Sequence, residues 1–202
     1  MSTSRSKAER HAQTRAALLR EARRLFAEHG FADSSTNEVV ARAKVTRGAL
    51  YYHFPDKRAL FEGVFEAVAQ EILARIETAT AASPSPAEAL VRGCRAFLDA
   101  GLDPSVRRIY LLDAPSVIGW RRWREIDARY AMGSLRLGIE AALETPSTRR
   151  ELDAETLTYL LSGALNEAAL WIAEAPDAED VRRRCDASIE QLVRSVFEEA
   201  KA

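Results

Sequence analysis

The stretch TRGALYYHFPDKRALF, residues 46–61, sets four ring side chains side by side and follows them with a proline and a lysine. In a buried strand, the tyrosine hydroxyls and the histidine ring would all need internal hydrogen-bond partners. A short helix avoids this, because Leu50 and Phe54 lie four residues apart on one face and can both be buried. The rings of Tyr51, Tyr52 and His53 then project away from the core.

Helices are also predicted before this stretch. Over residues 7–29, apolar residues recur at three- and four-residue intervals between arginines and glutamates, which is typical of an amphipathic helix. Gly30 fits the end of that helix, with glycine in the left-handed position and the next apolar residue folding back on the last turn. In SSTNEVVARAKV, residues 34–45, Ser35 and Glu38 have the spacing of a capping box for a helix of barely two turns.

Two further helices are predicted within and after the opening stretch. Thr46 can cap a helix over residues 47–53, and Pro55 ends it because the residue before a proline avoids the helical region. Asp56 can cap a long fourth helix that reaches toward Thr80. Two short helices joined by about three residues are typical of a helix-turn-helix. The face opposite the buried pair is then free to lie in the major groove, with its rings toward the sugar-phosphate wall.

Charge divides the chain into two parts. Residues 1–60 hold 12 lysines and arginines against 6 acids, which leaves 17 basic and 24 acidic residues in the rest of the 202-residue chain. These numbers give a balance of +6 in the first part and −7 in the second. Such a division indicates a basic head for a polyanion on an acidic body, although chance could also produce it.

The body that follows the loop ATAASPSPAEA, residues 79–89, is predicted to be helical as well. Glycines and prolines separate its segments, and no alternating run of β-branched residues interrupts them. The fold class is therefore all-α. The helical segments are expected at about 87–101, 105–114, 119–144, 153–174 and 178–200.

Composition excludes several classes of protein. No apolar run approaches the roughly 20 residues of a membrane span, and no apolar signal segment is present. Cys94 and Cys185 lie far apart, so a disulfide framework is not expected and we interpret the protein as cytoplasmic. The histidines are His11, His29 and His53, all in the basic part, and neither cysteine has the spacing of a metal site. Because a glycine-rich phosphate loop and a nucleophile elbow are also lacking, we expect no enzyme, no metal and no cofactor.

Residues 10–61 resemble the DNA-binding domain of the tetracycline-repressor (TetR) family of transcriptional regulators. The family's pattern reads roughly as a Thr, an Ile-Ala pair, Ala-Gly-Val, and Leu-Tyr-x-His-Phe followed by a lysine. The corresponding positions are Thr36, Val40 with Ala41, Ala43 with Lys44 and Val45, Leu50 with Tyr51, His53 and Phe54, and Lys57. Lys44 stands where the family usually has a glycine. If that turn still needs a left-handed residue, lysine costs about 1 to 2 kcal/mol of backbone strain.

The resemblance implies a DNA-binding domain over residues 1–56 and a ligand-binding and dimerisation domain over residues 57–202. It also implies a homodimer, with residues 156–172 and 181–197 at the interface. The implied function is that of a ligand-responsive transcriptional repressor, which binds a palindromic operator in double-stranded DNA and is released by a small-molecule effector. The alternative is a DNA-binding protein of architectural or ligand-independent type, and the large aromatic body argues against it.

Arg47 is the first candidate for reading bases. Helix-turn-helix geometry and the resemblance both place base contacts at the start of the second helix, and arginine pairs well with guanine. A phosphate contact is the alternative. Arg5, Lys7 and Arg10 form either a minor-groove arm or a charged tail. The residues expected at the DNA are Thr36, Lys44, Thr46, Arg47, Gly48, Ala49, Tyr51, Tyr52, His53 and Lys57.

Aromatic residues gather in the middle of the body, in residues 107–135. Trp120 and Trp123 lie three apart and would share a helical face. Rings around a few polar groups are typical of a small-molecule pocket, but they are equally typical of a core, so both interpretations stay open. The candidates for ligand binding are Tyr110, Asp113, Trp120, Trp123, Tyr130, Asn166 and Trp171.

Overall fold

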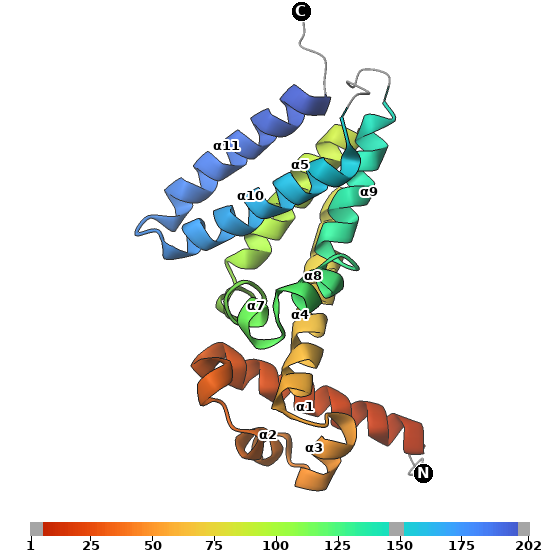
Figure 1. Cartoon of the computed structure of the whole chain (residues 1–202), viewed down its shortest axis with the longest axis vertical. Coiled ribbons are helices and arrows are strands. Elements are labelled where there is room, and N and C mark those ends of the chain that lie inside the picture. Colours follow the sequence, from red (N-terminus) through yellow and green to blue (C-terminus); the bar gives the residue numbers. More distant parts are fainter. Residues whose placement is uncertain (1–5, 146–151, 198–202) are drawn as a thin grey trace, which may run out of the picture.

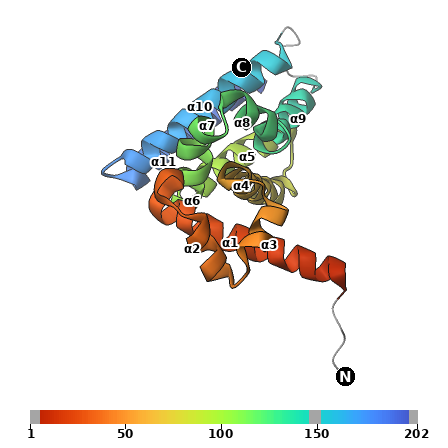
Figure 2. The same cartoon turned by 60° about the horizontal axis from the view of Figure 1, so that its bottom comes forward.

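The chain folds into a small helical head and a larger helical body, joined by one long helix, α4 (Lys57–Thr80) (Figure 1). The computed structural model describes residues 6–145 and 152–197, and within these ranges every regular element is a helix. The all-α prediction is therefore confirmed. Turning the lower end of the molecule toward the viewer brings α2 (Thr36–Ala43) and α3 (Arg47–His53) to the front (Figure 2).

The head consists of α1 (Lys7–Asp33), α2, α3 and the first turns of α4. Its core is aromatic. The ring of Phe61 on α4 has its centroid 5.1 Å from that of Phe26 and 5.4 Å from that of Phe31, and both partners lie near the end of α1. The start of α4 therefore completes the core of the head before the helix continues into the body.

Side-chain caps begin α3 and α4 where the sequence predicts them. The Thr46 hydroxyl accepts a hydrogen bond from the backbone N–H of Ala49 at 3.1 Å. The Asp56 carboxylate accepts one from the backbone N–H of Ala59 at 2.7 Å. These bonds satisfy N–H groups that the first turn of a helix leaves without partners.

The capping box predicted for α2 does not form, because Ser35 and Glu38 both bond other partners. Ser35 does cap the helix, by accepting a hydrogen bond from the N–H of Asn37 at 3.2 Å. Glu38 instead bonds Arg42, one turn further along the helix, at 2.7 Å. An opposite charge four residues away offers the carboxylate a stronger partner than the backbone N–H of Ser35.

Gly30 interrupts α1 with φ 78° and ψ 175°, a backbone conformation that side chains disfavour. After it, Phe31 folds back until its ring centroid lies 6.0 Å from that of Phe26, as the sequence predicts. A side chain at Gly30 would collide with the guanidinium of Arg108, which comes from the body. The bend thus requires glycine here, whereas the flexible end of Arg108 could move away from a side chain.

The body begins with α5 (Pro86–Gly101) and ends, within the described residues, with α11. No helix in the described part of the chain has the length and apolar character needed to cross a membrane. The segment predicted at 178–200 is confirmed up to residue 197, and its last three residues lie outside the described ranges. The remaining elements of the body are α6 (Pro104–Val106), the π-helix η1 (Arg107–Asp113), α7 (Ala114–Val117), α8 (Trp120–Asp127), α9 (Ala131–Leu143), α10 (Ala154–Glu174) and α11 (Ala178–Phe197).

One helix predicted in the body as continuous is in fact divided. The segment 119–144 forms α8 and α9, because Tyr130 leaves the helical region with φ −125° and ψ −111°. At this break the Tyr130 hydroxyl donates a hydrogen bond to Glu66 on α4 at 3.0 Å. Beyond the turn, a side chain at Gly133 would collide with the carbonyl oxygen of Ala128. The segment 105–114, in contrast, is helical throughout as predicted, because α6, η1 and α7 follow one another without a gap.

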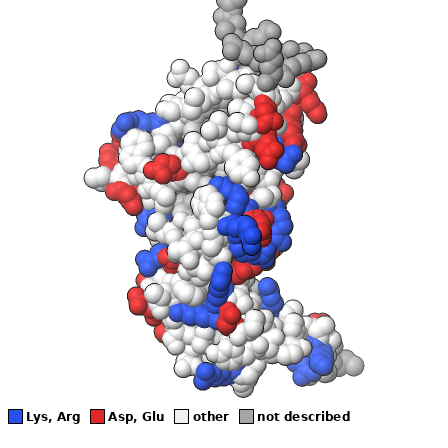
Figure 3. All heavy atoms as spheres, in the orientation of Figure 1, with Lys and Arg blue, Asp and Glu red and all other residues white. Residues whose placement is uncertain are grey.

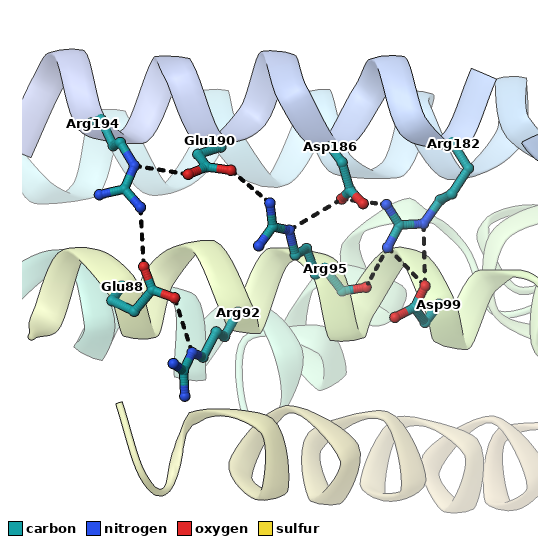
Figure 4. Close-up of polar contacts among 8 residues, drawn as sticks. All are labelled: Glu88, Arg92, Arg95, Asp99, Arg182, Asp186, Glu190 and Arg194. Atoms are coloured by element: carbon teal, nitrogen blue, oxygen red, sulfur yellow. Dashed lines mark hydrogen bonds and ion pairs between the residues drawn. The ribbon is translucent and has the colours of Figure 1, made fainter. Parts of the chain in front are cut away.

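Ion pairs join α11 to α5 along their facing sides (Figure 4). On α5, Arg95 bonds Glu190 at 2.6 Å, and on α11, Arg182 bonds Asp99 at 2.7 Å. A third link joins Arg194 to Glu88 at 3.1 Å. Exposed pairs each contribute only about 0 to 1 kcal/mol, but pairs that share partners in a network orient one another. The remaining residues of this α5–α11 network are Arg92 and Asp186.

Candidate DNA-binding face and ligand cavity

The orientation of α3 follows from its two apolar residues. Leu50 and Phe54 are buried in the core of the head, as the sequence predicts. Tyr52 is consequently 74% exposed, and Tyr51 and Arg47 are exposed beside it. In the view of Figure 3, basic side chains lie at the lower tip of the head, while acidic side chains gather toward the upper end of the body.

The turn between α2 and α3 has the left-handed residue that the sequence suggested. Lys44 has φ 54° and ψ 43°. The N–H of Val45 donates to the carbonyl oxygen of Val40 at 3.2 Å, and the N–H of Lys44 donates to that of Ala41 at 3.2 Å. These are the bonds by which a helix commonly ends before a left-handed residue. The turn therefore keeps its geometry with lysine in place of glycine, and the lysine side chain is exposed.

Most of the residues expected at the DNA lie on α2, on α3 and in the turn between them. Lys44, Thr46 and Gly48 are exposed with the α3 residues above, whereas Thr36 and Ala49 are half-buried. The Arg47 guanidinium lies over the Tyr51 ring, 5.5 Å from its centroid. Hydrogen bonds from Arg47 and Thr36 lower the pKa of the Tyr51 hydroxyl. Arg47 and the start of α2 thus form one connected polar surface.

Lys57 and His53 already have partners inside the protein. The Lys57 ammonium donates to the carbonyl oxygen of Ala32 at 3.1 Å and lies over the Phe31 ring, and burial lowers its pKa. The His53 ring lies 4.2 Å from that of His11 on α1. Because an ammonium group has three N–H donors and one bonds Ala32, Lys57 keeps donors for a phosphate.

Two residues of α1 join this face without having been singled out in the sequence. The His11 ring lies 5.6 Å from that of Tyr52, and Arg15 lies 5.5 Å from the centroid of the Phe54 ring. Burial lowers the pKa of His53, and the charges of His11 and Arg15 act in the same direction. Of the predicted arm, Lys7 and Arg10 belong to the first turn of α1, and residue 5 lies outside the described ranges. The sequence holds no signal for the His11 contact, since it depends on how α1 crosses α3.

A cavity of about 310 Å³ lies inside the body, between α4, α5, α9 and α10. That volume is within the range of small-molecule sites in proteins. Most of its wall is apolar. The larger apolar residues that line it are Ile76, Leu90, Phe97, Met132, Leu135 and Leu165.

One end of the cavity is polar. Asp127 is 2% exposed and accepts hydrogen bonds from the Tyr110 hydroxyl and, at 3.2 Å, from Arg124. The same nitrogen of Arg124 donates to the Ser162 hydroxyl at 3.1 Å. Burial raises the pKa of the Asp127 carboxyl, and the bonds from Tyr110 and Arg124 oppose that increase. Asn166 lines the cavity one turn beyond Ser162 on α10.

The residues expected to bind the ligand do not lie together in the structure. Asn166 lines the cavity, and Tyr110 lies behind its wall, bonded to Asp127. Trp123 is buried further back and donates its ring N–H to the carbonyl oxygen of Tyr110 at 3.1 Å. Trp120 stacks on Trp123 but is 61% exposed.

The other three expected ligand residues lie away from the cavity wall. Tyr130 bonds Glu66 on α4, as described above. Trp171 is about half exposed, with Arg184 over its ring, and Asp113 lies at the head. Sequence reasoning missed Asp127 and Ser162, because an acid within WRRWREID reads as one more charge on an exposed helix face.

The π-helix η1 lies between the cavity and the head. Tyr110, in its middle, bonds Asp127 in the cavity wall. Asp113, at its end, accepts a hydrogen bond from the backbone N–H of Phe31 at 3.0 Å and pairs with Arg108, which covers Gly30. One short element therefore contacts the cavity wall at one residue and the head three residues later.

Helices α10 and α11 leave apolar side chains on an outer face of the body. Leu160 is 67% exposed, and Tyr159 and Leu192 are more than half exposed. A hollow of about 240 Å³ beside them is lined entirely by apolar residues of α9, α10 and α11. Among the described residues, no group of three or more His, Cys, Asp or Glu could hold a metal ion.

Comparisons with known proteins agree with this architecture. Residues 18–64 match the family described as "Bacterial regulatory proteins, tetR family". Residues 87–196, more than half of the chain, match the family described as "Tetracyclin repressor-like, C-terminal domain".

Individual relatives match over different extents. The chain is similar to the Transposon Tn10 TetC protein of Escherichia coli, with 28% identity over 163 residues, 81% of this chain and 82% of that protein. It is also similar to the HTH-type transcriptional repressor BepR of Brucella suis, with 45% identity over 60 residues, 30% of this chain and 28% of that protein. A solved structure of a TetR-family transcriptional regulator from Pectobacterium atrosepticum superposes with a TM-score of 0.78 at 34% identity, covering 98% of this chain and 100% of that one.

Proposed function

Because the chain belongs to the TetR family, whose members are DNA-binding transcription regulators and not enzymes, we propose that it is a repressor controlled by a small molecule. It works in the cytoplasm and binds a palindromic operator as a homodimer. An effector that enters the cavity of the body releases the protein from the DNA.

The observation that carries this proposal is the apolar cavity with a polar end, which the π-helix connects to the head. Tyr110 links that element to the cavity wall, and Asp113 links it to Phe31. A ligand can shift a protein between two states only by binding one of them better. An effector that moves Asp127 favours a different position of the π-helix, and so of the head.

The homodimer is supported by the outer face of α10 and α11. Exposed Leu160 and Leu192, with the apolar hollow beside them, give this face the character of an interface that a second copy covers. A two-fold dimer presents two copies of α3 to the DNA. Their half-sites then lie about 34 to 36 Å apart, or a multiple of that distance.

The test is selection of binding sites from a pool of random duplexes by the full-length protein. The expected result is an inverted repeat, bound by one dimer, with affinity at least about 1,000-fold above that for random duplex. Light scattering on the complex measures its stoichiometry. Equal affinity for random and selected duplexes would favour the architectural alternative and overturn the proposal.

A further inference from the structure

The geometry of the cavity's polar end points to the chemical class of its ligand: a neutral, mostly apolar molecule that carries a hydroxyl group. We propose that this hydroxyl bonds Asp127 and Ser162 together. The inference rests on the proposed function, in that it takes the cavity to be the effector site.

The first step concerns what Asp127 can still accept. A carboxylate has about four acceptor positions. The Tyr110 hydroxyl, Arg124 and the backbone N–H of Met132 occupy three of them. Burial also raises the pKa of Tyr110 well above its ordinary value, so its hydroxyl keeps the proton that it donates. Asp127, which lines the cavity, therefore has one acceptor position left for a ligand.

The second step concerns Ser162, which is buried beside Asp127. Both side chains accept a hydrogen bond from the same nitrogen of Arg124, at 3.1 and 3.2 Å, so they lie next to each other. A hydroxyl that accepts a bond still has its own proton to donate. The polar end thus offers one acceptor and one donor at adjacent positions.

A hydroxyl group fits this pair because it can donate and accept at the same time. An ammonium group has only donors, so it leaves the Ser162 proton without an acceptor. A carboxylate has only acceptors and brings a second negative charge to Asp127. The charge of Asp127 is already balanced by Arg124 at 3.2 Å, and an unpaired ion is costly in an apolar cavity.

The apolar remainder of the ligand follows from the rest of the wall. Most of that wall, including Leu90, Phe97 and Leu165, is apolar, and its other polar residues are Thr80, Ser134 and Asn166. The ligand is therefore expected to be mostly apolar away from its hydroxyl. An apolar cavity of about 150 Å³ holds a benzene molecule. The cavity here, about 310 Å³, has room for a ligand on the order of 10 to 15 non-hydrogen atoms.

The test uses three probes of nearly equal shape and the full-length protein without DNA. The probes are 4-propylphenol, its isostere 1-methyl-4-propylbenzene, and 4-propylbenzoate, and calorimetry measures their dissociation constants at pH 7. The phenol is neutral at this pH, since a phenolic pKa is about 10. It should bind roughly 10- to 100-fold more tightly than the hydrocarbon, because the hydrocarbon leaves the remaining acceptor position of Asp127 and the Ser162 proton unused.

Variants assign the preference to the two side chains. Ser162→Ala should weaken the phenol by about 10-fold and leave the hydrocarbon unchanged, and Asp127→Asn should reduce the preference in the same way. Thr78→Ala is the matched control. It removes an exposed hydroxyl from α4, a helix that also contributes to the cavity wall. The affinities for the phenol and the hydrocarbon should both stay unchanged. Thermal unfolding of each variant shows whether it is folded. If Asp127→Asn does not fold, the result for Ser162→Ala decides the test.

The inference is overturned if the hydrocarbon or the benzoate binds as tightly as the phenol, or if none of the probes binds at millimolar concentration. Operator binding, followed in parallel by fluorescence anisotropy, separates this outcome from failure of the proposed function. If the phenol binds as expected but leaves the operator bound, the ligand class stands and release by an effector does not. If benzoate alone releases the operator, release by an effector stands and the proposed ligand class does not.

Discussion

Replacing Lys44 with glycine should make the protein more stable. Lys44 follows α2 with φ 54°, and among the described residues it is the one residue other than glycine with a positive φ. The bonds that close this turn come from backbone groups of Lys44 and Val45, and the lysine side chain is exposed. Glycine therefore keeps the bonds of the turn and loses little packing.

The size of the effect is the difference between two opposing contributions. A left-handed conformation costs a residue with a side chain about 1 to 2 kcal/mol, a cost that glycine does not have. Glycine also gives the unfolded chain more freedom, which opposes folding by about 0.5 to 1 kcal/mol. The net stabilisation is roughly 0.5 to 1 kcal/mol, which raises the melting temperature of a chain of 202 residues by about 1 to 4 °C.

Urea denaturation of Lys44→Gly and two controls measures this difference. Lys44→Ala removes the charge but keeps the strained backbone, so its free energy of unfolding should stay within about 0.5 kcal/mol of the original. Ala41→Gly places glycine in the right-handed part of α2, where it should cost about 1 kcal/mol. If Lys44→Gly proves no more stable than Lys44→Ala, the strain assigned to this turn is absent.

Further predictions concern DNA reading, assembly, coupling and acidity. Arg47→Ala should cost about 1 to 3 kcal/mol of operator affinity and flatten the preference at one base position per half-site, whereas a uniform loss for all sequences would indicate a phosphate contact instead. A chain truncated after Pro176 lacks α11 and should be a monomer or an aggregate without operator binding, so a dimeric truncated chain in light scattering refutes the assigned interface. Asp113→Ala removes the bond from η1 to the head, so it should keep operator binding and 4-propylphenol binding but weaken the effect of one on the other; unchanged coupling in anisotropy titrations excludes this path. Burial alone would raise the pKa of Glu71, but with the hydrogen bond from Arg23 this pKa stays below its ordinary value of 4.5. A carboxyl whose pKa is lowered by folding stabilises the folded protein above pH 4.5. Glu71→Gln should therefore be less stable at pH 7, and the difference in unfolding free energy should shrink as the pH falls below about 4.5; a gap that does not change with pH contradicts this reasoning.

The head could be predicted from the sequence because its signals are local. Thr46 and Asp56 cap the helices they precede, and the spacing of Leu50 and Phe54 decides which face of α3 is exposed. Each of these relations spans a few residues, and local geometry alone makes them visible in the sequence. Even the left-handed Lys44 could be anticipated, although only through the resemblance.

The cavity could not be predicted in the same way, because contacts between distant residues build it. Asp127 is polar and would be expected on the surface, yet Tyr110 on η1 bonds it and Arg124 links it to Ser162 on α10. At the break between α8 and α9, Tyr130 bonds Glu66, more than sixty residues away, and the hydrophobic pattern continues through the break without a change. The aromatic residues directed the prediction to the right segment of the chain. The rings chosen from it lie behind the wall of the cavity, however, and the polar groups in the wall were missed.

The α5–α11 network also fixes the register of α11. Along α5 the charges run Glu88, Arg92, Arg95 and Asp99, and the antiparallel α11 carries the opposite order of signs against them (Figure 4). Moving α11 by one turn in either direction along α5 would place two pairs of like charges opposite each other and leave one favourable pair. The helix therefore has one preferred position along α5. In the proposed dimer, the opposite face of α11 meets the second copy. The sliding position of this one helix then sets the distance between the two heads, and a charge reversal at Arg95, far from the DNA, should alter which spacing between half-sites the protein prefers.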